Sequence, residues 1–164
     1  MSRRGLFLLY GTIVFAVVLQ VAILPFHLET EFKPDLLLIV MVYLALRGSF
    51  ATGSPLAWML GLLKDTFSGL YLGLNAFSFL IIFLVIKSLS DRLYTESGFL
   101  FVVTVFVATV ASVASNLLLL LMFTKTPGIA YSMAAGLIPH LLVNSFLASL
   151  VVLLPGFARE QDVI

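Results

Sequence analysis

The stretch GLLKDTFSGLYLGLNAF, from Gly61 to Phe77, places a lysine and an aspartate inside a long apolar region. Lys64 and Asp65 are neighbours, so on a helix their side chains point about 100° apart and pair poorly with each other. We therefore expect Asp65 to meet a partner from elsewhere in the chain. Ser68 and Gly69, which follow, predict that the helix stops just after the charged pair.

Composition identifies the class of protein. The chain has 164 residues, of which 62% are hydrophobic and 10% charged, against about 25% charged in an ordinary soluble domain. So few charges cannot cover a soluble surface, and the chain is predicted to be an integral membrane protein. The net charge of +1 gives no electrostatic reason to expect nucleic-acid binding, and the lack of cysteine excludes disulfides and thiolate metal sites.

Apolar stretches predict an all-α polytopic protein with one integral membrane domain over residues 1–164. Crossing a hydrocarbon core of about 30 Å takes about 20 helical residues. The six expected helices cover residues 5–26, 34–50, 54–67, 72–90, 99–124 and 129–154. The second and third are short, and they span only if their charged ends snorkel or face protein. An alternative with five helices treats residues 48–65 as a re-entrant hairpin.

The basic residues predict the topology. Arg3 and Arg4 precede an apolar run without a convincing cleavage site, which favours an uncleaved signal-anchor over a signal peptide. With the N-terminus in the cytoplasm, the positive-inside rule is satisfied and both termini are cytoplasmic. The residues then inside are Arg3, Arg4, Arg47, Lys87, Arg92 and Arg159, and those outside are Lys33 and Lys125.

Two segments hold polar residues at the expected outer side. Pro34 and Asp35 are predicted to open the second helix at the outer interface, where a proline and a carboxylate suit the first turn. Lys33 lies on the same side of the membrane as Asp65, as a possible basic partner for it. Gly69 and Gly73 are four residues apart, a spacing that lets another backbone approach closely.

The last two expected helices carry polar and small residues that we expect to pack inside the bundle. Pro139 predicts a kink, and His140 and Asn144 share one face, turned to the interior. One histidine and one amide are too few for a metal site, and no cofactor is expected. The fifth helix presents a surface of small or polar residues: Ala108, Ala111, Ser112, Ala114, Ser115 and Asn116.

Catalytic patterns are weak, and we predict that the chain is not an enzyme. Neither histidine lies in a nucleophile motif, and no phosphate-binding glycine loop is present. The strongest enzymatic alternative is an aspartyl peptidase, because Asp35 and Asp65 are expected at the same membrane face and two close carboxylates can share a proton. The chain lacks the Asn/Gly/Asp-rich motifs of the lipoprotein signal peptidases.

Two segments, KPDLLLIVMVYLALRGS (Lys33–Ser49) and GLLKDTFSGLYLGLNAF, resemble the best-marked segments of the rod shape-determining protein MreD family. In that family a Pro-Asp pair opens the second helix. A G-L-x-x-D turn followed by S-G-x-x-L-G joins the third and fourth. The order and separation of the two segments, the length and the helix count agree, so the resemblance covers nearly the whole chain.

The resemblance implies a non-enzymatic scaffold in the bacterial inner membrane that supports sidewall peptidoglycan synthesis and rod cell shape. It also implies a direct partner, MreC, and a wider complex with a class B penicillin-binding transpeptidase, RodA and MreB. The turn of Asp65, Gly69 and Gly73 is expected to form an ordered periplasmic corner with Asp35, which holds the short helices together and helps to present a surface to MreC.

The family is similar in fold to the six-helix S-components of energy-coupling-factor transporters, which supplies the alternative of a vitamin-binding transport subunit. His140 and Asn144 would then line a residual cavity. Against it, the first helix LLYGTIVFAVVLQVA lacks an A-x-x-x-A docking surface, and the outer loop of residues 27–33 is short.

Overall fold

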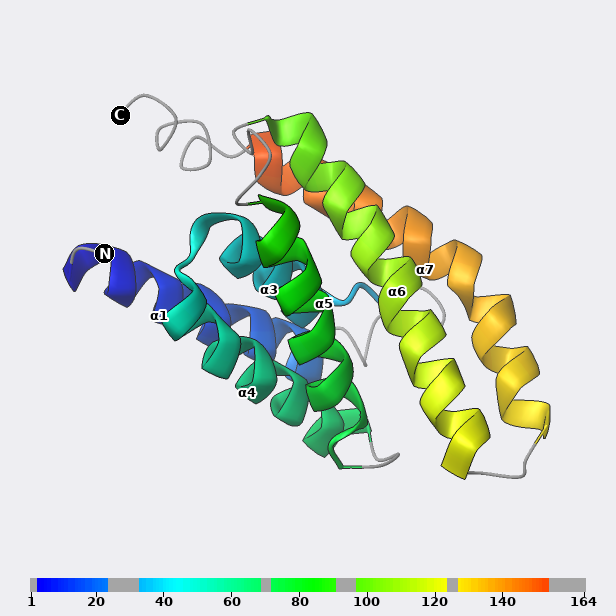
Figure 1. The fold of residues 1–164 in the computed structure, drawn as a ribbon. Coiled ribbons are helices and arrows are strands. Elements are labelled where there is room, and N and C mark those ends of the chain that lie inside the picture. Colours follow the sequence, from blue (N-terminus) through cyan, green and yellow to red (C-terminus); the bar gives the residue numbers. More distant parts are fainter. Residues whose placement is uncertain (1–2, 24–32, 69–71, 91–96, 124–126, 154–164) are drawn as a thin grey trace.

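The computed structural model describes residues 3–23, 33–68, 72–90, 97–123 and 127–153, and within them it is all-helical, with no strand (Figure 1). Six α-helices were expected, and the described residues form six. The elements are α1 (Arg3–Val18), the π-helix η1 (Leu19–Ile23), α3 (Leu36–Arg47), α4 (Phe50–Ser68), α5 (Leu74–Ser90), α6 (Gly98–Phe123) and α7 (Pro127–Leu153). Among the described residues, Gly98–Leu119 and Gly136–Leu153 are long and apolar enough to cross a membrane.

Several helix boundaries differ from the prediction, and those of α3 and α4 differ most clearly. α3 ends at Arg47, where an end at residue 50 was expected. α3 begins at Leu36, because Asp35 is its N-cap and Pro34 lies before the cap. α4 begins at Phe50, four residues early, because Ser49 caps it by accepting a hydrogen bond from the Thr52 N–H. α4 then runs without a break to Ser68, so the alternative with a re-entrant hairpin over residues 48–65 is wrong.

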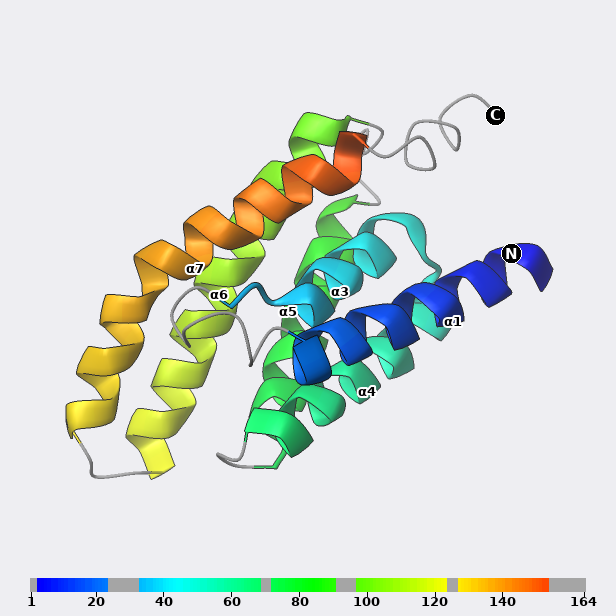
Figure 2. The ribbon, with the colours of Figure 1, turned by 180° about the vertical axis from the view of Figure 1, so that it is seen from behind.

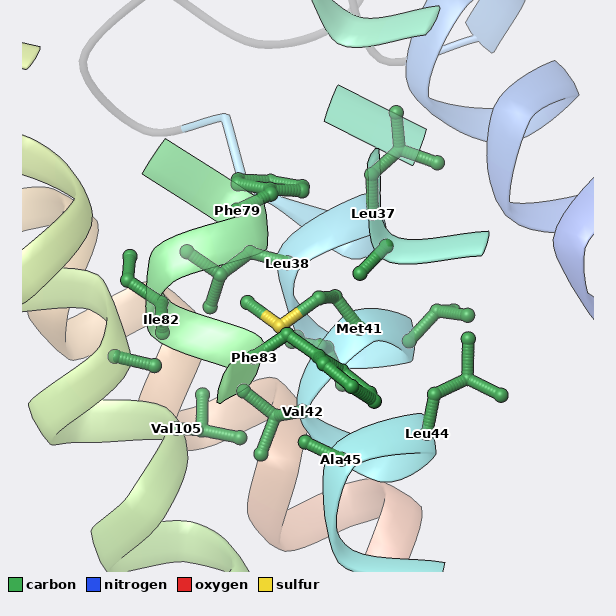
Figure 3. Packing of buried hydrophobic residues seen from close by; sticks show 14 of the residues in the cluster. Leu37, Leu38, Met41, Val42, Leu44, Ala45, Phe79, Ile82, Phe83 and Val105 are labelled. Carbon is green, nitrogen blue, oxygen red and sulfur yellow. The ribbon is translucent and has the colours of Figure 1, made fainter. Parts of the chain in front are cut away.

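α3 is the central helix of the fold. α1, α4, α5, α6 and α7 all contact it (Figures 1 and 2). It is apolar all round, which is typical of a helix enclosed by others. Its buried residues are Leu37, Leu38, Ile39, Val40, Met41, Val42, Leu44 and Ala45. Around it the core is completed by Phe79 and Phe83 of α5 and Val105 of α6 (Figure 3).

α4 and α5 form the closest helix pair, through a row of small residues on α4. Gly53, Ala57, Gly61 and Asp65 recur every four residues, and all four are buried. A Cβ atom on Gly61 would lie 2.4 Å from the Cα of Ala76, so only glycine allows this approach.

Gly69 and Gly73 were expected to provide such an approach, and only one of the two is among the described residues. Gly69 lies outside them. Gly73 has nothing within 4 Å of a Cβ position, and its role is conformational, since its φ of +100° is in the region that favours glycine.

α6 and α7 pair with each other, and α6 joins them to α3 and α5. The face of α6 turned to the core is narrower than the predicted small-residue surface. Ala108, Ser112 and Asn116 are buried, whereas Ala114 is exposed and Ala111 and Ser115 are partly buried. Residues four apart in sequence lie on the same side of a helix, so α6 packs against the core with one side.

Candidate functional site: a buried polar network

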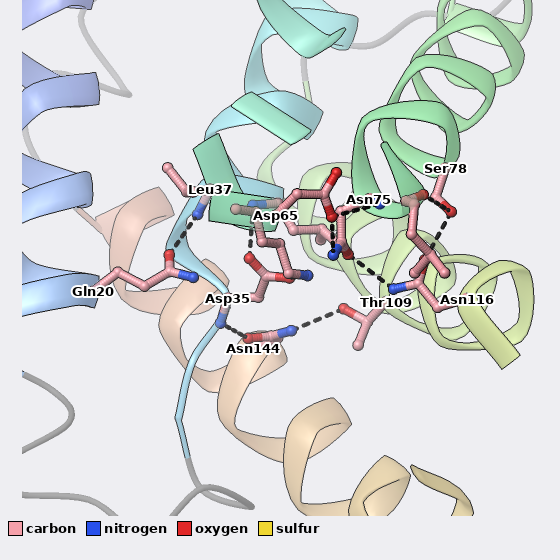
Figure 4. A network of polar contacts seen from close by, with 12 residues as sticks. Gln20, Asp35, Leu37, Asp65, Asn75, Ser78, Thr109, Asn116 and Asn144 are labelled. Atoms are coloured by element: carbon pink, nitrogen blue, oxygen red, sulfur yellow. Dashed lines mark hydrogen bonds and ion pairs between the residues drawn. The ribbon is translucent and has the colours of Figure 1, made fainter. Parts of the chain in front are cut away.

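The start of α3 is held by side chains from three parts of the chain (Figure 4). Asp35 caps its own helix, because its Oδ1 accepts a hydrogen bond from the Leu38 N–H at 3.2 Å. The Asp35 N–H donates to Oδ1 of Asn144 at 2.8 Å, and the Leu37 N–H donates to Oε1 of Gln20 at 3.1 Å. These first amides have no partner within the helix, so η1 and α7 supply the acceptors.

Lys64 and Asp35 form an ion pair that joins α4 to α3. The two side chains are only 21% and 11% exposed, so the pair is largely withdrawn from water. The Lys64 Nζ also lies 5.1 Å from the centre of the Phe79 ring, within cation–π range. The sequence left Lys64 without a partner, and the structure gives it Asp35.

Asp65, 3% exposed, caps the start of α5. Its Oδ2 accepts hydrogen bonds from the N–H groups of Gly73 at 2.9 Å and Ala76 at 3.1 Å. Its Oδ1 accepts from both the backbone N–H and the side-chain Nδ2 of Asn75, at 2.9 and 2.8 Å. The partner from elsewhere is therefore the start of the next helix, and Lys33 donates none of these four hydrogen bonds. A carboxylate there is favoured by the helix dipole.

Asn75 carries the network on to α6. Its Oδ1 accepts from Nδ2 of Asn116 at 2.8 Å, and Oδ1 of Asn116 accepts from the Ser78 hydroxyl at 2.8 Å (Figure 4). All three side chains are buried. Asp65, α5 and α6 are thus connected through neutral amide and hydroxyl groups.

Asn144 forms a second polar connection, which joins α7 to the start of α3 and to α6. It is 1% exposed, and besides accepting from Asp35 it donates through Nδ2 to Oγ1 of Thr109 at 3.1 Å. Thr109 donates in turn to the carbonyl of Val105. His140, predicted to share the interior face, is only partly buried, one turn earlier on α7. Both ends of the Asn144 amide are used within the chain.

The network lies near the middle of the two longest helices. Thr109 is the twelfth residue of α6, which has 26, and Asn144 is the tenth from the end of α7. Asp35 lies just before the start of α3 and Arg47 at its end, so the length of α3 separates them, about 18 Å at about 1.5 Å per residue. α3 therefore starts beside the centres of α6 and α7 rather than beside their ends.

The arrangement offers little for catalysis or metal binding in the part of the chain that the structure describes. No group of three or more His, Cys, Asp or Glu is found there that could hold a metal ion. Each carboxylate of Asp35 and Asp65 accepts hydrogen bonds from N–H donors on both oxygens. This geometry is that of two separate capping groups, whereas two carboxylates that share a proton would have to lie against each other.

Gln20, Asn75, Ser78 and Thr109 were missed by the sequence analysis. Asn75 stands in the opening stretch, two residues after Gly73, where an Asn in the first turn of an apolar helix is a usable signal. Gln20 is the one polar residue of η1, and Thr109 is one of several polar residues in α6. Only the fold shows which group each one meets.

A double-mutant cycle tests the ion pair. Lys64→Met leaves the Asp35 carboxylate without its cation, and we expect a loss of about 2 kcal/mol in the free energy of unfolding, between the values for exposed and buried pairs. Asp35→Asn combined with Lys64→Met should cost less than the sum of the single changes, measured by thermal unfolding in detergent micelles. Strictly additive losses would show that the pair contributes nothing.

Asn144→Phe tests how tightly the second connection is packed. The ring is too large for a site that is 1% exposed, and the Asp35 N–H loses its acceptor, so we expect a loss of about 3 kcal/mol. The matched control is Leu142→Phe, which puts the same ring at an exposed position of α7 and should behave like the parent. Equal stability of the two variants would contradict a packed polar cluster at Asn144.

A chain with few charges, whose described residues are all-helical and place an ion pair inside the bundle, is typical of a helical membrane protein. The model of the family described as rod shape-determining protein MreD matches residues 2–158, so this chain belongs to the MreD family. Membership implies a role in rod shape determination, as a membrane protein of the cell-shape machinery. Comparison with curated proteins and with solved structures gives no match.

Proposed function

We propose that this protein is a multi-pass scaffold of the bacterial inner membrane, with residues 1–164 as one integral membrane domain and both termini in the cytoplasm. It binds MreC directly, and through MreC it supports the class B penicillin-binding transpeptidase, RodA and MreB in sidewall peptidoglycan synthesis. It has no catalytic activity and no cofactor. Membership of the MreD family supports a role in rod shape determination, and the geometry of the polar network supports a scaffold without catalytic activity.

The observation that carries the proposal is that the polar groups of the network bond within the chain itself. Asp35 and Lys64 pair with each other, and Asp65 caps α5. An enzyme or a carrier keeps polar groups available for substrate, whereas a scaffold needs them to fix its own shape. The amide of Asn144, which a vitamin-binding subunit would turn to a ligand, is bonded at both ends.

The polar groups give α3, α4 and α5 a fixed geometry. α3 is too short to cross a bilayer alone, because its 12 residues extend about 18 Å. Its N-terminus is satisfied inside the protein, which is how irregular backbone is tolerated at membrane depth. We infer that Asp35 lies near mid-membrane, deeper than the outer interface expected from the sequence. Asp65 and the start of α5 then form an outer corner on which MreC binds.

Affinity purification of the tagged protein from its native membrane in mild detergent, followed by mass spectrometry, tests the proposal. Recovery of MreC with wall-synthesis enzymes is the expected result. Recovery of a transmembrane coupling protein with paired ATPases would instead identify the alternative, a substrate-binding subunit similar in fold to the S-components of energy-coupling-factor transporters.

A further inference from the structure

The α6–α7 pair, called here the arm, is attached to the other helices in two different ways along its length. In the half of α6 that begins at Gly98, the residues turned to α3 and α5 are apolar: Phe101, Val105 and Ala108. In the other half the buried residues of α6 are polar: Thr109, Ser112 and Asn116. α7 shows the same change from apolar to polar. Its buried residue Ala148 is apolar, and Asn144, the next buried residue toward the outer end, is polar.

Hydrogen bonds between neutral groups join the polar half of the arm to α5 and to the start of α3. Asn116 bonds to Asn75 and Ser78 of α5, and Asn144 bonds to the Asp35 N–H at the start of α3. Beyond Asn116, α6 continues for seven residues to Phe123, past the start of α5 at Leu74. Figures 1 and 2 show the arm leaning away from α4 and α5 over this part.

The two kinds of attachment differ in how they respond to movement. Interdigitated apolar side chains resist separation because opening them leaves a void. Hydrogen bonds between neutral groups of membrane helices are weak, about threefold each in an equilibrium constant, because the separated groups find other partners. Three such bonds together favour the closed arm about 27-fold, which leaves an open minor state at a few per cent.

We propose that the arm is a movable element, which pivots on the apolar seam of Phe101, Val105, Ala108 and Ala148 and is held closed by the hydrogen bonds of Asn116 and Asn144. Opening separates the outer ends of α5 and α6 and leaves their cytoplasmic ends in contact. The inference does not depend on which partner binds the protein.

Distance measurement between paired spin labels tests the pivot, and the lack of cysteine in the chain makes labelling specific. The outer pair is Leu72→Cys with Met122→Cys, and the inner pair is Leu89→Cys with Phe99→Cys. All four positions are exposed. In the parent chain we expect the outer pair to show a main short distance with a minor longer one, and the inner pair a single distance.

Two graded variants then shift the populations. Ser78→Ala removes one of the hydrogen bonds, and the longer outer distance should gain about threefold over the shorter one. Asn116→Ala removes two, and the gain should be about ninefold. Thr104→Ala, which removes a hydrogen bond within α6 to the Leu100 carbonyl, is the matched control and should leave both pairs as in the parent.

The outcomes separate a pivot from general loosening. A graded change at the outer pair with a fixed inner pair supports the proposal. An outer distance that is the same in the parent, Ser78→Ala and Asn116→Ala overturns it. Equal broadening at both pairs also overturns it, because the arm would then be coming off as a whole. Since Ser78→Ala is nearly isosteric at a fully buried site, it keeps the test valid even if Asn116→Ala does not fold.

Discussion

Asp65→Ala is expected to lower the free energy of unfolding by roughly 3–5 kcal/mol, because it leaves four N–H donors at the start of α5 without their acceptor. Three are backbone amides and one is the side chain of Asn75. The site is 3% exposed, so water replaces the carboxylate poorly. Because Asn75 also bonds to Asn116, the loss should extend to the contact between α5 and α6.

Two companion variants separate charge from shape at this position. Asp65→Asn keeps the size but replaces one accepting oxygen by a donor, so about half of the loss is expected. Thr66→Ala is the neighbouring control, since Thr66 is exposed and bonds only back to the Leu63 carbonyl. Thermal unfolding of the purified proteins in detergent measures all three. An Asp65→Ala protein as stable as Thr66→Ala would show that the cap is dispensable.

Gly61→Ala is expected to cost about 3 kcal/mol or to prevent accumulation of folded protein, through direct overlap of backbones. The added Cβ would lie 2.4 Å from the Cα of Ala76 and 2.6 Å from the carbonyl oxygen of Asn75. A side chain can change rotamer to relieve such an overlap, but a helix backbone cannot. α4 and α5 must therefore move apart, which also strains the hydrogen bonds of Asp65.

Two other glycines calibrate this effect. Gly11→Ala on α1 meets nothing within 4 Å and should be neutral or slightly stabilising. Gly53→Ala meets the ring of Phe83, a side chain, and should fall between the two, with the yield of folded protein from membranes as the common measure. The account of α4–α5 packing would be refuted by a Gly61→Ala protein recovered as well as Gly11→Ala.

The sequence predicted the helical class and the number of helices because apolar runs and their interruptions are local features. It placed the starts of α3 and α4 at the wrong residues, because each start is decided by one N-cap. Asp35 moves the start of α3 past Pro34, and Ser49 moves the start of α4 forward. These two side chains accept hydrogen bonds from first-turn amides that have no acceptor within the helix, and hydropathy does not record such caps.

The polar residues of the candidate site were easier to predict than their partners. Asp35, Asp65 and Asn144 are conspicuous because polar groups are costly in an apolar chain. Which group each one meets depends on how the helices pack, and Asp35 and Asn144 are 109 residues apart. Only the divergence of Lys64 and Asp65 was predictable locally, from the helical angle between neighbours.

Gly61 shows a second limit of the sequence analysis. The row of Gly53, Ala57, Gly61 and Asp65 has the four-residue spacing that favours close packing, and it stood in the sequence beside the more conspicuous Gly69 and Gly73. Spacing alone does not distinguish a glycine that lets a helix approach from one that lets the backbone turn. The structure assigns the first role to Gly61 and the second to Gly73.

The central claim is that the charge at Asp65 fixes the corner of α4 and α5 on which the scaffold depends. The most direct measurement replaces the gene by one encoding Asp65→Asn, and records cell shape together with the amount of MreC that co-purifies, at equal levels of membrane-inserted protein. We predict rounded cells and several-fold less MreC, with Thr66→Ala cells unchanged. Rod-shaped cells with parental recovery of MreC would contradict the claim.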